Sequence, residues 1–424
     1  MREMKDSGVE WIRDIPVDWE LSKIGAVYEE RNVKVSDNDY VPLSVTKKGI
    51  VPQLETAAKT DNGDNRKLIK KNDFVINSRS DRRGSCGISK FDGSCSLINT
   101  VLKPRKNMHN AYYDFVFHSD LFADEFYAWG NGIVDDLWST KWSSMKRIYI
   151  PAPPIDEQIK IADYLDDKCS KIDAIIAKQE KIIEKIKLYK SSLIMELVLG
   201  GLHAGIHMKD SGYDFIGEVP STWSVMRLRN IGTPQNGISK GGEFFGQGFP
   251  FVSYGDVYRN FKLPESVPGL VDSTEEEREK YSVREGDIFF TRTSETIEEV
   301  GFSCVCEKTI ADATFAGFLI RVRPKNDILY TGYAKYYFRS NHLREYLVKE
   351  MNLVTRASLG QDLLKSMPVL IPPKEEQIEI ANYLDQKCKS IEKQVACREK
   401  LISKLTEYKK SLIYECVTGK KEIL

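Results

Sequence analysis

The sequence predicts an α+β protein in which two similar β-rich domains are each followed by one long helix, and the two helices pair as a coiled coil. Three observations predict this fold class. A long segment occurs twice, at residues 153–200 and 372–419, and the copies align without a gap. A shorter opening motif also occurs twice, once before each globular region. The regions between them hold short β-branched and aromatic runs bounded by Gly, Asn and Asp, which is typical of strands.

Both copies of the long segment are predicted to be helices. Each begins at a Pro-Pro pair, at Pro153 and Pro372, and proline suits the start of a helix. Acidic residues follow at once, where the positive end of the helix dipole favours them. Each segment ends at a glycine, Gly200 or Gly419, with no other Gly or Pro between its ends.

Apolar residues recur along both helices at steps of three and four, which is the pattern of a coiled-coil seam flanked by Lys and Glu. From Asp156 to Val198 the first helix would be about 65 Å long. A helix of that length needs a partner, and the other copy is the obvious one. The predicted seam, with Tyr189 and Tyr408 as packing residues, comprises Ile172, Ile176, Ile182, Ile183, Ile186, Tyr189, Leu193, Ile391, Val395, Leu401, Ile402, Leu405, Tyr408 and Leu412.

The opening motif reads KDSGVEWIRDIPVDW at 5–19 and KDSGYDFIGEVPSTW at 209–223, and its tryptophans Trp11, Trp19 and Trp223 are expected to anchor the cores. Self-similarity of this kind indicates a duplicated plan of domain, helix, domain, helix. The predicted segments are 1–152 (first domain), 153–200 (first helix), 201–208 (linker), 209–371 (second domain) and 372–424 (second helix and C-terminal tail).

The two globular regions share a predicted skeleton. Matching strands are expected at Asp73–Asn77 and Asp287–Thr291, and at Leu97–Leu102 and Phe318–Val322, with matching short helices at Tyr112–Phe117 and Tyr333–Phe338. The connecting loops differ in length and residue type. This pattern indicates one fold used twice to hold two different ligands.

Composition bounds the class of protein. The 424 residues carry 62 basic and 62 acidic side chains, and zero net charge counts against a generic nucleic-acid binder. A local basic stretch at 66–83 is compatible with one. No apolar run approaches membrane-spanning length, and the N-terminus lacks the apolar core of a signal peptide. A cytoplasmic protein with eight reduced cysteines and no membrane contact is expected.

Catalytic motifs are missing from the sequence. The Pro-Pro pairs lack the flanking residues of a base-flipping methyltransferase loop, and neither a P-loop nor a dinucleotide-binding glycine motif occurs. The five histidines show no metal or triad spacing; His203 and His207 are separated by Gly205, with no acidic base following. We therefore expect a non-catalytic protein.

The repeated helix, the "DSG…IP…W" opening and the "PP…EQ" helix start together resemble the DNA-specificity subunit of Type I restriction–modification systems. The resemblance covers essentially the whole chain. It implies that the domains are target-recognition domains, each reading one half of a split site in double-stranded DNA. It also implies that the helices pair antiparallel, set the spacing of the half-sites and dock two methyltransferase subunits.

Further partners follow from the same resemblance. Restriction subunits, which translocate on DNA and cleave it, are compatible with it. It implies no cofactor on this chain: S-adenosylmethionine, ATP and magnesium are expected on partner subunits only. A coiled-coil scaffold without sequence-specific DNA binding is the alternative, although a tether would not need two similar domains with diverged loops.

Candidate DNA contacts lie in loops that follow the predicted strands. Arg79 follows the strand ending at Asn77, and Arg292 follows the strand ending at Thr291. Arginine paired with guanine is the commonest specific contact, so these two residues are the first candidates. Lys47 and Lys48 match Tyr254 and its neighbours, and Lys141 and Trp142 match Gln361 and its neighbours. The full set is Lys47, Lys48, Arg79, Arg82, Arg83, Lys141, Trp142, Tyr254, Arg292, Thr293, Arg356 and Gln361.

Two matched pairs lie near the helix starts, Gln158 with Gln377 and Tyr164 with Tyr383. They are either positions that dock a partner subunit or caps of the helix starts, and docking is slightly favoured.

Overall fold

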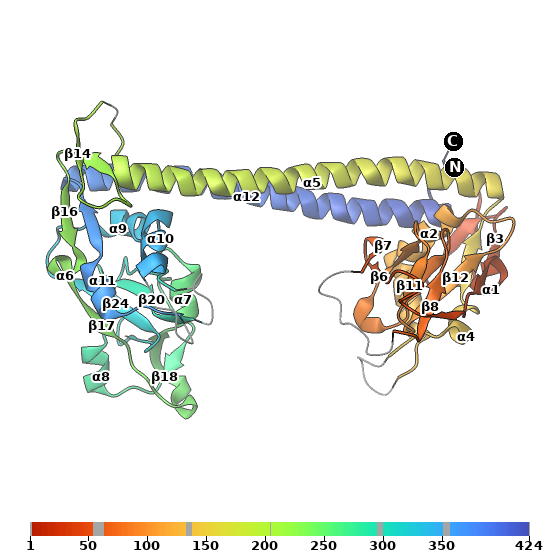
Figure 1. The fold of residues 1–424 in the computed structure, drawn as a ribbon, viewed down its shortest axis with the longest axis horizontal. Helices are drawn as coiled ribbons and strands as arrows, with labels where there is room; N and C mark the ends of the chain where they lie inside the picture. The colour runs from red at the N-terminus through yellow and green to blue at the C-terminus, as the bar shows by residue number, and fades with distance from the viewer. Residues whose placement is uncertain are drawn as a thin grey trace. The chain divides into compact units, whose positions relative to one another are not determined.

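The chain folds into two compact units, each holding one globular domain and half of each long helix. Unit 1 comprises Met1–Glu180 and Glu399–Leu424, and unit 2 comprises Lys181–Arg398. The computed structural model describes residues 2–53, 63–132, 138–203, 205–294, 300–350 and 357–423. Figure 1 shows the elements of each unit.

The opening motif forms a small hairpin in unit 1. Strands β1 (Met4–Asp6) and β2 (Asp14–Pro16) pair antiparallel. Strand β3 (Glu20–Lys23) then pairs with β13 (Tyr149–Ala152), which leads directly into the first long helix. Trp11, Trp19 and Trp223 are buried, which confirms their predicted role as core anchors.

The domain of unit 1 is built on two sheets. The four-stranded sheet has the order β10-β9-β12-β4, with β4 Tyr28–Glu30, β9 Phe74–Asn77, β10 Cys86–Ile88 and β12 Asn99–Pro104. The second sheet has the order β11-β8-β5, with β5 Lys34–Val35, β8 Arg66–Ile69 and β11 Gly93–Cys95. Strands β6 (Leu43–Thr46) and β7 (Gly49–Pro52) form a hairpin.

Helices α2 (Asn110–His118) and α3 (Asp120–Ala128) contribute an aromatic core that packs on the four-stranded sheet. Phe117 lies between Phe74 of the sheet and Phe122 of α3, with ring centroids 4.7 and 4.8 Å away. The short elements α1 (Ile24–Val27), η1 (Ser80–Arg82) and α4 (Trp142–Met145) complete this domain.

Unit 2 repeats the four-stranded sheet of unit 1, whereas its three-stranded sheet differs by one parallel pairing. Its four-stranded sheet has the order β17-β24-β20-β22, with β17 Gly232–Asn236, β20 Ile288–Thr291, β22 Ser303–Val305 and β24 Leu319–Pro324. Its three-stranded sheet has the order β19-β18-β23, with β18 Phe245–Val252, β19 Leu270–Val271 and β23 Thr314–Phe315. The remaining strands are β14 (Met208–Asp210), β15 (Glu218–Pro220), β16 (Ser224–Arg227), β21 (Thr293–Ser294), β25 (Ala357–Ser358) and β26 (Pro368–Ile371).

The helices of unit 2 are α6 (Leu228–Ile231), η3 (Gly242–Phe244), α7 (Tyr254–Arg259), α8 (Glu275–Lys280), α9 (Thr331–Tyr337), α10 (Asn341–Glu350) and α11 (Gln361–Ser366). The predicted short helices are therefore confirmed as α2 and α9. The predicted strands at Asp73–Asn77 and Asp287–Thr291 are confirmed as β9 and β20, and each pairs antiparallel with the matching strand, β12 or β24.

The two repeated segments form the long helices α5 (Ile155–Gly200) and α12 (Lys374–Val417). Each begins two residues after the first proline of its Pro-Pro pair. The turn after each helix uses a glycine in the left-handed region, Gly201 at φ 78° and Gly419 at φ 72°. A residue in the left-handed region cannot continue a right-handed helix, and glycine adopts that region without steric cost. Gly419 therefore suits the turn that follows α12.

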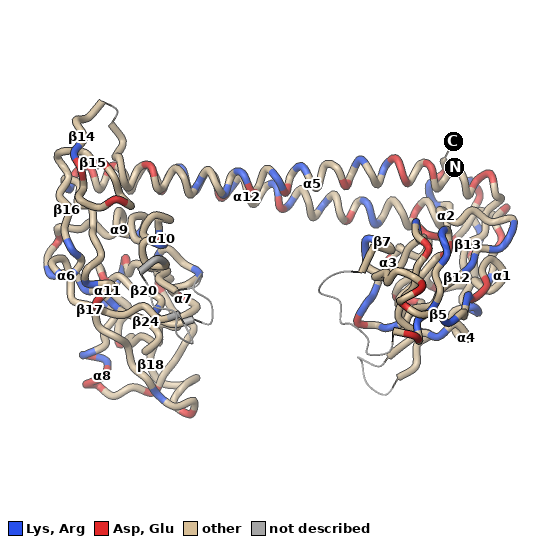
Figure 2. The backbone as a smooth tube through the Cα atoms, in the orientation of Figure 1, with Lys and Arg blue, Asp and Glu red and all other residues tan. Residues whose placement is uncertain are grey.

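Within each unit α5 and α12 pair antiparallel. In unit 1 the Nζ atom of Lys409 lies 2.7 Å from Asp173, and in unit 2 the Nζ atom of Lys190 lies 2.7 Å from Glu392. Lys190 and Lys409 occupy equivalent positions of the repeated helices, and so do Asp173 and Glu392. The two helices are therefore aligned in the same way in both units. Figure 2 shows Lys, Arg, Asp and Glu distributed along both helices.

The seam differs from the prediction at its tyrosines. Tyr189 and Tyr408 are 58% and 54% exposed, so their assignment as packing residues is wrong. The seam instead passes through the next residue, Lys190 or Lys409, whose ammonium group forms the interhelix ion pair. The buried or half-buried positions of α5 include 176, 179, 183, 186, 190, 193 and 197, which recur at alternating steps of three and four. Lys190 therefore keeps the heptad spacing, and Tyr189 lies one position off it. Leu401, also predicted in the seam, is 41% exposed and lies one position before the seam residue Ile402.

Candidate nucleic-acid interface

The loop after β9 and the loop after β20 start with matching backbone hydrogen bonds. Ser78 N–H donates to the Ile98 carbonyl, and Arg292 N–H donates to the Phe318 carbonyl. The carbonyls of Ser78 and Arg292 then accept from the N–H groups of Thr140 and Leu359. Arg292 is therefore the structural counterpart of Ser78.

This register fixes the relative positions of the two candidate arginines, Arg79 and Arg292. Arg79 bridges to Ser139, and Thr293 pairs with Ser358, so Arg79 matches Thr293 rather than Arg292. Neighbouring residues of an extended chain face opposite sides. The two arginines therefore lie at neighbouring positions of the loop, not at one repeated position, and each domain presents its cation differently.

The loop carrying Arg79 continues as the short turn η1. Arg82 forms an ion pair with its neighbour Asp81, and its side chain is 66% exposed. Arg83 is held by α3: it pairs with Asp124 and donates to the Asp120 carbonyl. The hydrogen bond with Asp124 raises the pKa of the Arg83 guanidinium. Arg82 is thus the more available of the two cations for a phosphate.

Three predicted loops meet along one edge of the first domain. Ser80 N–H donates to the Trp138 carbonyl, which brings the Arg79 loop beside the segment before Lys141. A Cβ atom on Gly87 would lie 2.9 Å from the Cα atom of Gly49. The β6–β7 hairpin turn therefore packs closely against β10, the strand that follows the Arg79 loop. Lys47, Lys48 and Lys141 are exposed and Trp142 is half-buried.

The matching positions of the second domain have different local structure. Lys47 and Lys48 form the two-residue turn of a hairpin, whereas Tyr254 begins helix α7, which a capping box at Ser253 and Asp256 starts. Lys141 and Trp142 match Gly360 and Gln361 at the starts of α4 and α11. Gln361 Nε2 donates to Asn236 Oδ1 over 3.0 Å. Arg356 lies outside the described residues.

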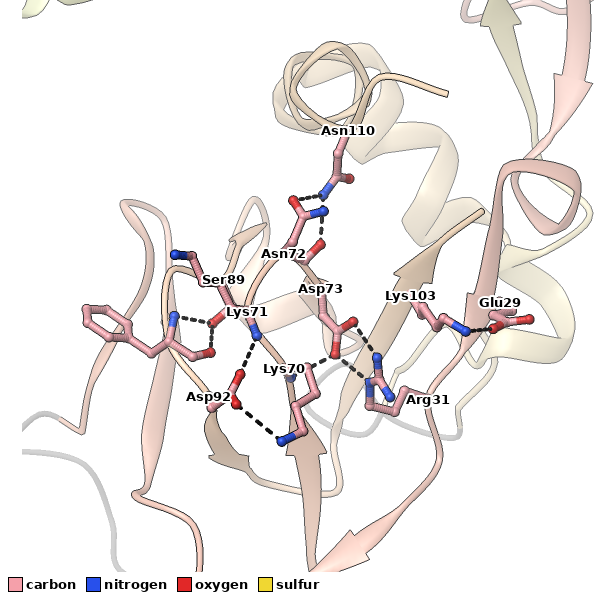
Figure 3. A network of polar contacts seen from close by, with 11 residues as sticks. Glu29, Arg31, Lys70, Lys71, Asn72, Asp73, Ser89, Asp92, Lys103 and Asn110 are labelled. Atoms are coloured by element: carbon pink, nitrogen blue, oxygen red, sulfur yellow. Dashed lines mark hydrogen bonds and ion pairs between the residues drawn. The ribbon is translucent and has the colours of Figure 1, made fainter. Parts of the chain in front are cut away.

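A buried carboxylate fixes the far end of β9. Asp73 is 2% exposed, accepts from the Lys70 N–H and binds the Arg31 guanidinium through both oxygens (Figure 3). Asp287 does the same before β20, accepting from the Arg284 N–H and binding Arg323. Arg31 follows β4 whereas Arg323 lies in β24, so the carboxylate is the shared feature. These contacts hold the strand that carries each candidate loop.

The strands paired with β9 and β20, namely β10 and β22, are anchored by different chemistry. In unit 1 the Cys86 Sγ lies 3.6 Å from the His118 Nε2, and the His118 Nδ1 lies 2.8 Å from the Asp114 carbonyl. Burial lowers the pKa of His118, but the charge of Cys86 and the contacts with Asp114 outweigh it and hold that pKa well above its ordinary value. In unit 2 Arg339 donates to the Ser303 carbonyl over 2.7 Å. Burial lowers the pKa of Arg339 to about 10.

The two glutamines near the helix starts are internal caps, which corrects the docking assignment. Gln158 is 4% exposed; its Oε1 accepts from the His109 N–H and its Nε2 donates to the Pro153 carbonyl. Gln377 is 1% exposed and makes the same contacts with Tyr330 and Pro372. Side chains this buried offer no surface to a partner.

Tyr164 and Tyr383 keep part of their rings accessible. Both are half-buried against the core of their own unit, with Lys168 and Lys387 over the rings at 5.6 and 5.2 Å. Their docking role stays a prediction, as do the DNA contacts.

Within the described residues, no cluster of three or more His, Cys, Asp or Glu side chains is arranged to hold a metal ion. None of the helices in that part of the chain combines the length and the apolar character that a bilayer crossing requires.

Comparison with known proteins shows which family has this architecture. The profile of the "Type I restriction modification DNA specificity domain" family matches twice, at residues 16–188 and 220–397. The Type I restriction enzyme EcoKI specificity subunit of Escherichia coli is 27% identical over 80% of this chain and 73% of that protein. The MjaVIII specificity subunit of Methanocaldococcus jannaschii is 23% identical over 96% of this chain and 93% of that protein.

Solved structures share the fold. A chain solved in work on complex assembly and conformational transition of the type I R-M system has a TM-score of 0.75 at 16% identity, covering 96% of this chain and 99% of that one. The HsdS subunit from Thermoanaerobacter tengcongensis has a TM-score of 0.53 at 17% identity, covering 96% of this chain and 98% of that one. With both domains matched by the family profile, the chain belongs to the Type I restriction modification DNA specificity family.

Proposed function

We propose that this chain is the DNA-reading specificity subunit of a Type I restriction–modification complex, and that each domain reads one half of a split site in double-stranded DNA. One observation carries the proposal. The four-stranded sheets of the two domains share strand order and pairing, but the domains differ where their loops face outward, as in the hairpin of Lys47 and Lys48 against helix α7. Common skeletons with unlike loops suit two readers of different sequences.

The helix pair supports the second part of the proposal, in which α5 and α12 set the distance between the half-sites and dock two methyltransferase subunits. Matching ion pairs at Lys409–Asp173 and Lys190–Glu392 give each unit the same interhelix register. A duplicated register presents two similar surfaces, which suits two copies of one partner. A rigid spacer also demands a fixed gap, since one turn of B-DNA advances about 34 Å.

The chain has no catalytic role in this proposal. Methylation and cleavage belong to partner subunits, which carry S-adenosylmethionine, ATP and magnesium. Restriction subunits join the same complex, which acts in the cytoplasm. This chain supplies contacts to DNA: phosphate contacts position it and contacts to base edges give the specificity.

A duplex-binding assay tests the proposal. The full chain with its methyltransferase subunit is titrated with duplexes that carry or lack the methylated site of the host genome, at several salt concentrations. We expect a preference for the site and an affinity that falls steeply with salt, because phosphate contacts release counterions. Binding without sequence preference or salt dependence would instead favour the alternative, a coiled-coil scaffold.

A further inference from the structure

A four-residue turn leads into an interior strand of the four-stranded sheet in each domain. In unit 2 the turn leads into β24, and the Leu319 N–H donates to the Ala316 carbonyl over 3.0 Å. In unit 1 the turn leads into β12, and the Asn99 N–H donates to the Ser96 carbonyl over 3.0 Å. Leu319 and Asn99 pair with the last residues of β20 and β9, so the two turns occupy equivalent places.

Each turn exposes a large apolar side chain. Phe318 is 63% exposed, which makes it the most exposed aromatic residue among those that the structure describes. Leu97 is 40% exposed in the turn of unit 1. Single exposed apolar side chains are common on protein surfaces and need no explanation by themselves. Exposure at equivalent turns of two domains, whose other loops differ, indicates a shared use.

The turn of unit 2 is held from two sides. The Ile238 N–H, from the segment after β17, donates to the Phe315 carbonyl over 2.9 Å. The Ala316 N–H donates to the Val252 carbonyl of β18 over 3.0 Å. The backbone that carries Phe318 is therefore fixed before a ligand binds, and little backbone entropy is lost when the ring enters a ligand.

Both exposed side chains lie beside a candidate DNA-binding loop. The Arg292 N–H donates to the carbonyl of Phe318 itself over 2.9 Å. In unit 1 the corresponding hydrogen bond joins the residue before Arg79 to the residue after Leu97. Each domain therefore brings together a cation, which suits a phosphate or a guanine edge, and an apolar side chain, which suits the stacked faces of bases.

We propose that Phe318 and Leu97 are wedges, each of which inserts between two base pairs of the half-site read by its own domain. This inference rests on the proposed function and deepens it. Apolar side chains that enter the base stack partly unstack one step and kink the duplex. The wedges therefore add a selection for deformable DNA to the selection made by base contacts. Pyrimidine–purine steps deform most easily, so such a step is expected at each wedge.

The bend of the DNA is the first readout. The full chain with its methyltransferase subunit binds a duplex that carries the methylated site of the host genome and a fluorophore at each end, and energy transfer reports the distance between the ends. We expect the unaltered chain to bend the duplex. Phe318→Ala and Leu97→Ala should each reduce the bend and weaken binding about 10-fold, because stacking on the bases is lost. The double variant should bend the duplex least.

A mismatch scan locates each wedge. A mismatched pair is already partly unstacked, so a wedge that enters beside it has less stacking to break. Mismatches are placed one at a time in both half-sites, away from the methylated adenines. The unaltered chain should bind more tightly to a mismatch at one step in each half-site. Phe318→Ala should remove this gain in the half-site of the second domain alone, and Leu97→Ala in that of the first domain alone.

Two exposed phenylalanines away from these turns are the matched controls. Phe91 is 43% exposed between β10 and β11, at the opposite end of its sheet from Leu97. Phe245 is 41% exposed at the start of β18, whose last residue is the one that holds the turn of Phe318. Phe91→Ala and Phe245→Ala should keep the bend, the affinity and the gain from mismatches. Circular dichroism should show that every variant is folded.

Equal bending and equal mismatch preference in the unaltered chain and the double variant would refute the wedges, and so would losses of the same size in the controls. Loss of the methyltransferase subunit from Phe318→Ala, measured by native mass spectrometry, would refute them too, by showing that the ring contacts protein instead of DNA. An unaltered chain without preference for the site would refute the proposed function, and the wedges with it.

Discussion

His342 is a neutral imidazole enclosed in the core of unit 2. It is 4% exposed, its Nδ1 lies 2.9 Å from the Ser340 hydroxyl, and its ring lies 5.6 Å from that of Tyr337. Burial lowers its pKa to about 4. The unfolded chain, with a histidine pKa near 6.5, binds the proton first as the pH falls. The stability contributed by the neutral ring is therefore complete above pH 6.5 and is lost as the pH falls toward 4.

Replacing this ring should flatten the pH dependence of stability. We expect the unaltered chain to lose up to about 3 kcal/mol from this site between pH 6.5 and 4. His342→Phe should lose less over the same range, because the phenyl ring does not titrate. Thermal unfolding followed from pH 7 to pH 4.5 at constant ionic strength measures the difference. Equal slopes for both proteins would show that His342 is protonated without penalty.

Arg79 and Arg82 separate base contacts from phosphate contacts. Arg79→Ala should weaken binding roughly 5- to 150-fold when the half-site read by the first domain is intact, and relax the preference for one base in it. Arg82→Ala should weaken all duplexes alike and reduce the salt slope by about one. Titration of duplexes with single substitutions in either half-site measures both effects. Relaxed specificity in the half-site of the second domain would contradict the assignment of Arg79.

At the residue scale, the strand ends predicted at Asn77 and Thr291 already place Arg79 and Arg292 one position apart. The backbone groups that hold this register, the Ile98 and Phe318 carbonyls, lie just before β12 and β24, so local residue types do not reveal them. The burial of Gln158 and Gln377 is of the same kind, because distant backbone groups hold these side chains.

At the scale of elements, the long helices are the most predictable part of the chain. Their prolines, acidic first turns and terminal glycines are local signals, and α5 and α12 begin and end within a few residues of the predicted positions. Which side chains enter the seam is less predictable. Lys190 occupies a seam position because Glu392 on the other helix binds its ammonium group. A search for apolar residues alone passes over it.

Shortening both helices tests their role as a spacer. Removing one heptad from each should shorten the pair by about 10 Å, which corresponds to about three base pairs. We expect the tolerated gap between half-sites to shrink by that amount, or binding to be lost if the turn of the DNA no longer suits both domains. Selection from a duplex library with variable gaps measures the change. An unchanged gap would contradict the spacer.

At the scale of the whole molecule, the duplication predicts two similar units. It does not predict which helix ends enter the core of each unit. The core of unit 1 contains Leu412 and Val417 from the end of α12, and Tyr112 donates to the Val417 carbonyl. The core of unit 2 contains Leu193 and Val198 from the end of α5 in the same way. The compact units therefore cut across the segments that the sequence suggests, because each domain packs on the start of its own helix and the end of the other.

The most direct test of the account is the adenine methylation pattern of the host genome with and without this chain. We predict one motif that depends on the chain and consists of two specified blocks separated by an unspecified gap of constant length. Arg79→Ala should change one block and leave the other block and the gap intact. A continuous motif, or methylation that persists unchanged without the chain, would contradict the claim that two domains read two halves of one site.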